Sequence, residues 1–161
     1  MRLGILTNPH LVPEDRATDG DMARYRSALR HCVREGVDGL ALLGDLSGSG
    51  DAASLEAGLR LAARTKLTVW VVSGNHDLVE REDALAEAVR RVGAHNVRLA
   101  TPAGEAFDGG GVRVAGVCAA SDNYGYTTRS DQRPDVLGWG EKPVVFLSHY
   151  PTVSFRETAE R

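Results

Sequence analysis

The ten residues Thr68-Val69-Trp70-Val71-Val72-Ser73-Gly74-Asn75-His76-Asp77 join an apolar run to a polar loop. Thr68–Val72 is rich in β-branched and aromatic side chains, and its continuous apolar pattern is typical of a strand covered on both faces. The polar segment Gly74–Asp77 begins almost as soon as this strand ends. Since ligands of open α/β sheets bind beyond the carboxyl ends of the strands, the stretch predicts a buried strand that delivers polar side chains to a binding edge.

The segments before and after this stretch alternate between strand and helix patterns. Strands are predicted at Arg2–Thr7 and Gly39–Leu43, and the intervening segments carry apolar stripes at helical spacing. Asp51 and Gly93 supply helix start and stop signals. The three predicted stripes consist of Met22, Tyr25, Leu29, Cys32 and Val33, then Leu55, Leu59 and Ala62, and finally Leu85, Ala88, Val89 and Val92 of a helix at Asp83–Val92. This order predicts an α/β sheet with right-handed crossovers.

The second half of the chain is less regular. Strands are predicted at Val97–Leu99, Val112–Val117 and Val144–Ser148, and the long polar segment Ala119–Lys142 is predicted to be a functional loop or a partly ordered one. Neither internal repeats nor low-complexity tracts divide the sequence, so residues 1–161 are interpreted as a single domain.

Composition excludes several classes of protein. The 161 residues are 42% hydrophobic and 25% charged, which is ordinary for a globular domain and not for a disordered, collagen-like or coiled-coil chain. The net charge of −3 indicates no specific nucleic-acid partner, and no apolar run approaches the roughly 20 residues that span a bilayer. The first residues are too interrupted for a signal peptide. Cys32 and Cys118 lie far apart in the sequence and form no Cys-x-x-Cys pair, so they are interpreted as reduced core residues. We therefore expect a cytoplasmic protein.

Polar residues follow four of the predicted strands. Asn8 and His10 follow the first, Gly44-Asp45 the second, Gly74–Asp77 the third, and Ser148-His149 the last. Taken alone, an Asp after a strand is usually a turn or cap residue, and a single His is usually a satisfied polar residue. Together they supply the imidazole nitrogens and the carboxylate and amide oxygens that divalent metals bind, so we expect a metal site at this edge.

These motifs also carry a family resemblance. The set Asn8-Pro9-His10, Gly44-Asp45, Gly74-Asn75-His76-Asp77 and Ser148-His149-Tyr150-Pro151 resembles the calcineurin-like metallophosphoesterases over residues 3–151. The Gly-Asn-His-Asp segment is its most specific element. The resemblance implies a β-sandwich flanked by helices, which we expect to be truncated in its second sheet.

The resemblance also implies a role for each site residue. Asp45 would bridge two metal ions, Asn8 and His10 would bind the first, and Asn75 and His149 would bind the second.

Two further residues would act in the reaction itself. His76 would be the general acid or charge stabiliser, and Asp77 would orient it. The implied activity is hydrolysis of a small phosphomonoester or phosphodiester by a metal-bridged hydroxide. One or two divalent ions are expected, and the mixed nitrogen and oxygen ligands suit manganese, iron or zinc.

The sequence departs from the family pattern in two ways. Asn8 stands where the family has Asp, which removes a unit of negative charge next to a cation. The family's later Gly-His-x-His segment is absent, because no histidine follows His149. We therefore expect weakened metal binding and a second sheet with an exposed edge, through which the chain would form a homo-oligomer.

Other interpretations remain open at this level. The chain could be a catalytically impaired member of the family, or a fragment of a longer polypeptide, that acts as a binding or assembly protein. It could also be a nucleotide-binding module that holds phosphate on the Gly44–Gly50 loop at a helix start.

Overall fold

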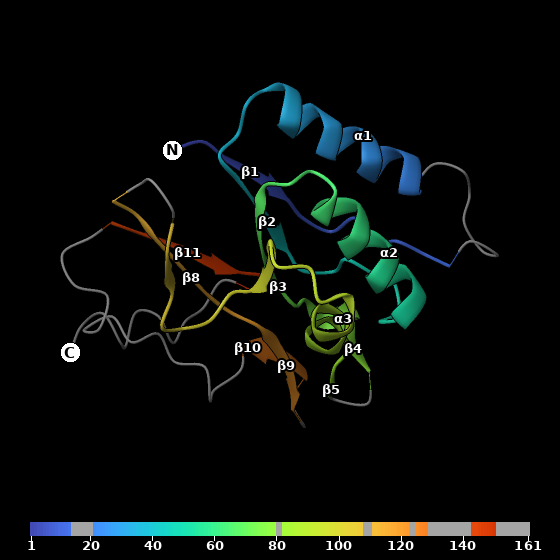
Figure 1. Ribbon diagram of the computed structural model, residues 1–161. Coiled ribbons are helices and arrows are strands. Elements are labelled where there is room, and N and C mark those ends of the chain that lie inside the picture. The colour runs from blue at the N-terminus through green and yellow to red at the C-terminus, as the bar shows by residue number, and fades with distance from the viewer. Residues whose placement is uncertain (14–20, 80–81, 108–110, 123–124, 129–142, 151–161) are drawn as a thin grey trace, which may run out of the picture.

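The computed structural model describes residues 1–13, 21–79, 82–107, 111–122, 125–128 and 143–150 (Figure 1). Its helices are α1 (Asp21–Arg34), α2 (Ala52–Ala63), the 3₁₀ turn η1 (Asn75–Asp77) and α3 (Ala84–Val92). Its strands are β1 (Leu3–Leu6), β2 (Gly39–Leu43), β3 (Thr68–Val72), β4 (Leu78–Val79), β5 (Glu82–Asp83), β6 (Val97–Leu99), β7 (Glu105–Ala106), β8 (Arg113–Val117), β9 (Ala119–Asp122), β10 (Gly125–Thr128) and β11 (Val144–Ser148).

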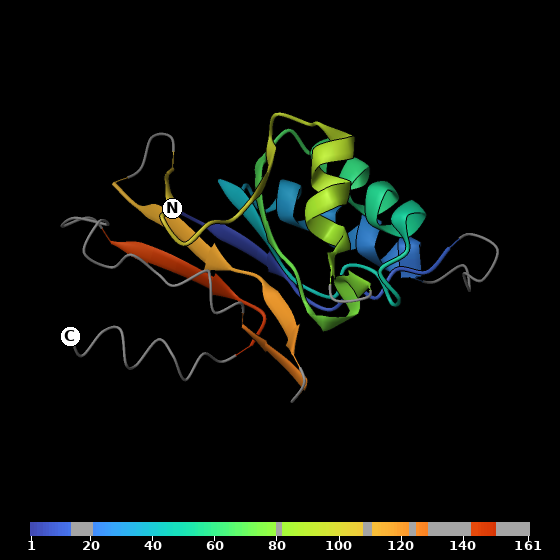
Figure 2. The ribbon, with the colours of Figure 1, turned by 90° about the horizontal axis from the view of Figure 1, so that it is seen from below.

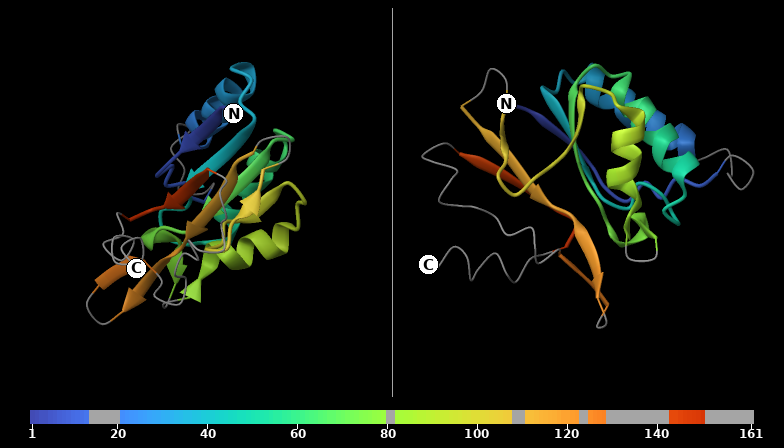
Figure 3. Two further views of the ribbon diagram at one scale, coloured as in Figure 1. Left: turned by 90° about the vertical axis from the view of Figure 1, so that its left-hand side faces the viewer. Right: turned by 60° about the horizontal axis from the view of Figure 1, so that its bottom comes forward.

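Two main sheets, two small two-stranded sheets (β9–β10 and β4–β5) and one layer of helices make up the described residues. The first sheet is parallel, with strand order β1-β2-β3-β6, and the second has the order β11-β8-β7. The three helices lie on one face of the first sheet, and the second sheet lies on its opposite face (Figures 2 and 3). The predicted sandwich flanked by helices is confirmed.

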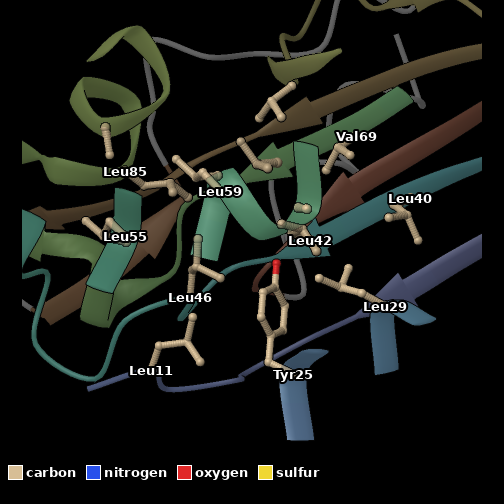
Figure 4. Packing of buried hydrophobic residues seen from close by; sticks show 14 of the residues in the cluster. Leu11, Tyr25, Leu29, Leu40, Leu42, Leu46, Leu55, Leu59, Val69 and Leu85 are labelled. Carbon is tan, nitrogen blue, oxygen red and sulfur yellow. The ribbon is translucent and has the colours of Figure 1, made fainter. Parts of the chain in front are cut away.

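The larger core lies between the helices and the first sheet (Figure 4). Tyr25, Leu29 and Cys32 of α1 are buried there, as are all three predicted residues of the α2 stripe. The prediction for Val33 was wrong, since its side chain is 46% exposed. The buried stripe of α1 follows the spacing i, i+4, i+7, which leaves Val33 at the margin of the apolar face.

A second core lies between the two sheets. Along β3, Val69 and Val71 belong to the helix-side core, whereas Trp70 and Val72 pack against residues of the second sheet. Successive side chains of a strand point to opposite faces, so the continuous apolar run of β3 follows from burial on both sides. Cys118 is buried in this second core, and burial raises the pKa of its thiol to about 11. Both cysteines are buried thiols outside any disulfide, as predicted.

The predicted helix boundaries are also confirmed. Asp51 accepts a hydrogen bond from the Ser54 amide at the start of α2, and Asp83 accepts one from the Ala86 amide at the start of α3. Gly93 ends α3 in the left-handed region at φ 59°, a conformation that glycine adopts without steric cost.

The prediction of a long loop at Ala119–Lys142 was partly wrong. Ala119–Asp122 and Gly125–Thr128 form the antiparallel pair β9–β10, whereas residues 129–142 lie outside the described part of the chain. The segments of this pair, AASD and GYTT, show no alternation of apolar and polar residues, so the sequence pattern could not predict them as strands. In the described part of the chain, none of the helices has the length and hydropathy needed to cross a bilayer.

The helix-side core gives the first testable expectation. Leu59→Ala removes a fully buried side chain of α2 and should lower the free energy of unfolding by about 2–5 kcal/mol, because the surrounding residues only partly fill the cavity. Urea unfolding followed by circular dichroism measures the change.

Val33→Ala is the matched control on the neighbouring helix. It removes an exposed side chain and should change stability by less than about 0.5 kcal/mol. Equal losses in the two variants would contradict the assignment of the core.

Candidate metal centre

Three loops bring His10, Asp45 and His76 together. Their ligand atoms all lie within 4.8 Å of one another. His10 Nε2 lies 3.7 Å from Asp45 Oδ2, and the rings of His10 and His76 meet edge to face with their centroids 4.8 Å apart. The predicted convergence after β1, β2 and β3 is therefore present.

The second sheet contributes a further histidine near Asp45. His149, directly after β11, places Nε2 3.5 Å from Asp45 Oδ2 and 3.2 Å from Asn75 Oδ1. Asp45 Oδ2 thus faces one imidazole nitrogen from each sheet. A carboxylate oxygen between two sets of nitrogen and oxygen donors is what a bridging metal ligand requires. The His10–Asp45–His76 group therefore fits a divalent cation, and His149 places a further nitrogen near the same carboxylate oxygen.

Asp45 is held firmly in this place. Its side chain is 4% exposed, and Oδ1 accepts a hydrogen bond of 2.9 Å from the His76 amide. A buried carboxylate is costly unless charges or donors compensate it. Among the described contacts, the His76 amide supplies such a donor to Oδ1, whereas Oδ2 faces only the His10 and His149 nitrogens at 3.7 and 3.5 Å, so Asp45 is well suited to a cation.

The backbone at the site is strained at three predicted residues. Asn8, His10 and Asp45 adopt positive φ angles of 53°, 46° and 52°, which cost on the order of 1–3 kcal/mol each for residues other than glycine. Hydrogen bonds link the two loops, from the Asn8 amide to the Gly44 carbonyl at 3.2 Å and from the His10 amide to the Asp45 carbonyl at 3.0 Å. Strain concentrated in this way is typical of functional sites.

Two glycines allow the loops to approach each other. A Cβ atom at Gly74 would lie 2.2 Å from Asp45 Oδ1, and one at Gly44 would lie 2.6 Å from His149 Nδ1. Sequence reasoning used these glycines only as parts of motifs and missed their steric role. The sequence does contain a pattern that could have predicted this role: a glycine directly precedes a polar site residue twice, in Gly44-Asp45 and in Gly74-Asn75.

His76 is exposed, and its ring is fixed by a backbone group. Nδ1 lies 2.9 Å from the Gly48 carbonyl oxygen, so Nδ1 carries the proton in that contact and Nε2 is left to act as a ligand or to exchange a proton. This nitrogen arrangement is compatible both with the predicted acid and with a ligand in the His10–Asp45–His76 group.

Asp77 is fully buried and binds backbone amides. Oδ2 accepts from the Gly74 amide at 2.9 Å, and Oδ1 accepts from the Ser47 amide at 3.1 Å. Burial raises the pKa of this carboxyl to about 6, although the backbone hydrogen bonds oppose the shift. The described contacts of Asp77 tie the β2 and β3 loops together, so any orientation of His76 by Asp77 acts through the backbone of η1.

Asn8 is an exposed residue whose backbone lies in the linked loops. Its Oδ1 accepts a hydrogen bond from the Thr7 hydroxyl. The amide oxygen is therefore already polarised by a donor. The amide carries no formal charge, and the described contacts do not join its side chain to His10, Asp45 or His76.

The Gly44–Gly50 loop does not offer a free helix start. Asp51 Oδ1 accepts from the Ser54 amide at 2.8 Å, and Asp51 Oδ2 accepts from the Ser47 hydroxyl at 3.1 Å. A carboxylate already occupies the N-terminus of α2, and it would repel a phosphate there. This geometry argues against the nucleotide-binding interpretation of the loop.

Comparison with known proteins decides the family. The family model described as calcineurin-like phosphoesterase matches residues 1–160. The chain belongs to the calcineurin-like phosphoesterase family. The family supports metal-dependent hydrolysis of phosphate esters, and His10, Asp45 and His76 form a group that could hold a divalent ion.

Solved structures support the same fold. The chain is similar to the crystal structure of TT1561 of Thermus thermophilus, with a TM-score of 0.66 and 14% identity, covering 98% of this chain and 76% of that one. A further crystal structure matches with a TM-score of 0.52 and 14% identity, over 71% of this chain and 51% of that one. No curated protein matches the sequence. At such low identities the likeness shows the fold alone.

Tyr150 is a residue of this phosphoesterase chain that sequence reasoning did not assign to the site. Its hydroxyl donates a 2.6 Å hydrogen bond to Asn75 Oδ1, and its ring meets that of His149 at a centroid distance of 4.8 Å. An amide presents either an oxygen or an NH₂ group to a cation, and only the oxygen can bind it. A donating hydroxyl favours the orientation in which Oδ1 lies beside His149 Nε2.

Tyr150→Phe should therefore weaken Mn²⁺ binding at the second position by about 10- to 100-fold, as loss of an outer partner of a metal ligand typically does. In an Asn75→Asp background the same change should have little effect, because either carboxylate oxygen can bind. Calorimetric titration of the metal-free protein with Mn²⁺ measures both values.

Tyr25→Phe is the control, since the Tyr25 hydroxyl contacts the distant Gly58 carbonyl. An equal loss from Tyr150→Phe in both backgrounds would show that Tyr150 only supports the local structure.

Proposed function

We propose that this protein hydrolyses a small phosphate ester, either a phosphomonoester or a phosphodiester, with divalent ions held on the two sides of Asp45. The observation that carries the proposal is the position of Asp45 Oδ2, 3.7 Å from His10 Nε2 and 3.5 Å from His149 Nε2. Manganese, iron and zinc suit this mixed set of nitrogen and oxygen donors.

When bound, two such ions lower the pKa of a shared water and offset the charge that develops on the phosphate. The residues of this chain have separate parts in that chemistry. His10 and Asn8 would hold the first ion, Asn75 and His149 the second, and Asp45 both.

His76 has the position of a proton donor. Its ring is exposed, lies against His10, and is fixed through Nδ1 by the Gly48 carbonyl. In the imidazolium form, which carries a proton on both nitrogens, Nε2–H would pass its proton to the leaving oxygen or stabilise the charge on it, and the ring would return to the neutral Nδ1–H form. Asp77 would keep this loop in place by binding the Gly74 and Ser47 amides.

The charge balance supports a weakened centre. Among the five proposed ligands, Asp45 is the only carboxylate, and Asn8 supplies a neutral oxygen in place of the family's Asp. The first ion would therefore be held less firmly than the second, which lies beside the more deeply buried His149.

The neutral Asn8 also favours a second candidate function. A chain that binds one ion or none could serve as a binding or assembly protein, and the edge strands β1 and β11 would be its pairing surfaces. Ile5 on β1 is 57% exposed, in keeping with a homo-oligomer. A cytoplasmic location, inferred from two cysteines that form no disulfide, also stays a prediction.

The two functions are separated by hydrolysis of a chromogenic phosphodiester and the matching monoester with added Mn²⁺. Asn8→Asp should raise turnover by about tenfold or more at limiting Mn²⁺, because a restored charge beside a cation contributes more than about 1.4 kcal/mol. His76→Ala should lower turnover by about 10²- to 10⁴-fold, as expected for loss of an acid.

His31→Ala is the control, since His31 is an exposed histidine of α1. Absence of Mn²⁺-dependent turnover in the folded wild type and in the Asn8→Asp variant would reject the hydrolase and favour the binding protein.

A further inference from the structure

A groove between α1 and α2 has an unusual charge. Its lining includes Arg26, Arg30 and Arg34 of α1 and Arg64 at the end of α2, around a cavity of about 780 Å³. None of its lining residues is an Asp or Glu, so the groove carries a formal charge of +4 in a chain with a net charge of −3. The two helices lie side by side on the helical face (Figures 1 and 2).

These four arginines differ from the other arginines of the described ranges. No side-chain hydrogen bond or ion pair is found for any of the four within the part of the chain that the structure describes. Every other arginine described there has such a partner: Arg2, Arg24, Arg60, Arg90, Arg91, Arg98 and Arg113. The unpaired guanidinium groups are therefore concentrated in one place.

Helix electrostatics explain only part of this arrangement. A helix C-terminus stabilises cations through the macrodipole, which accounts for Arg34 in the last turn of α1 and Arg64 at the C-cap of α2. Arg26 and Arg30 lie in the middle of α1, where that effect has faded. Like charges one turn apart destabilise a helix, so the row Arg26, Arg30, Arg34 needs another reason.

The floor and rim of the groove indicate the kind of ligand. Leu29 is buried and Leu61 is half-buried at the floor, and Val33 presents an exposed apolar side chain among the arginines. Guanidinium groups bind phosphate oxygens in a bidentate manner. The three arginines of α1 are spaced by one turn, about 6 Å of helix rise each, so they present a row of donors to a chain of phosphates. The volume falls within the usual range for small-molecule sites.

We propose that the groove between α1 and α2 binds a small ligand that carries a chain of phosphates, such as a nucleoside triphosphate. The phosphate chain lies along Arg26, Arg30, Arg34 and Arg64, and the apolar floor accommodates the nucleoside. The site shares no residue with the metal centre, which follows the carboxyl ends of the strands. The groove is formed by the ends of α1 and α2 that precede β2 and β3.

The test is a calorimetric titration of the full chain with ATP, with inorganic tripolyphosphate and with adenosine, in EDTA so that no metal is available at the Asp45 centre. The wild type should bind ATP and tripolyphosphate saturably, more weakly as salt rises. Tighter binding of ATP than of tripolyphosphate identifies a nucleotide as the ligand, and equal binding identifies the phosphate chain alone.

Matched double variants locate the site. Arg30→Ala with Arg64→Ala removes one groove arginine from each helix and should weaken binding about 100-fold, since each charged hydrogen-bond partner contributes roughly tenfold. Arg24→Ala with Arg60→Ala removes the same charge from the same helices outside the groove and should leave the affinity nearly unchanged. No saturable binding by the wild type, or equal losses in the two double variants, would overturn the proposal.

Discussion

The position of the Asp45 carboxylate constrains much of the structure around it. It is buried at the carboxyl edge of the first sheet, it accepts the His76 amide through one oxygen, and it faces His10 and His149 with the other. An unpaired buried carboxylate would be costly. The loops around Asp45 place a backbone donor and imidazole rings next to it. Asn8, His10 and Asp45 adopt left-handed backbone conformations in these loops.

This arrangement depends on both sheets. The loops after β1, β2 and β3 reach Asp45 from within one parallel sheet, whose carboxyl ends share an edge by topology. His149 reaches it from β11 of the second sheet, and its ring is anchored by a 2.9 Å contact between Nδ1 and the Leu43 carbonyl. The packing of the two sheets therefore has two effects. It buries Trp70 and Val72, and it adds His149 to the group of side chains near Asp45.

Charge is distributed unevenly over the domain. The proposed metal ligands include one carboxylate, whereas four arginines without partners in the described part of the chain line a groove on the helical face. The other arginines of α1 and α2, Arg24 and Arg60, form ion pairs with Asp21 and Glu56. The four groove arginines have no such acidic partner in the described residues. A site with uncompensated charge favours a ligand of opposite charge. The Asp45 centre would therefore bind cations, and the arginine groove would bind an anion.

The sequence by itself determined the alternating strands and helices, the helix start at Asp51 and stop at Gly93, and the polar residues at four strand ends. These features depend on local periodicity and on side chains that bond their own backbone, so they can be predicted from residue order. Only the tertiary structure decided that Asp45 Oδ2 lies between His10 and His149, that Tyr150 contacts Asn75, and that four arginines share one groove. It also decided that Val33 is exposed and that β9 and β10 pair within a polar segment. These outcomes depend on how separate elements pack, and the distances between elements far apart in the chain are set by packing and loop geometry rather than by residue order.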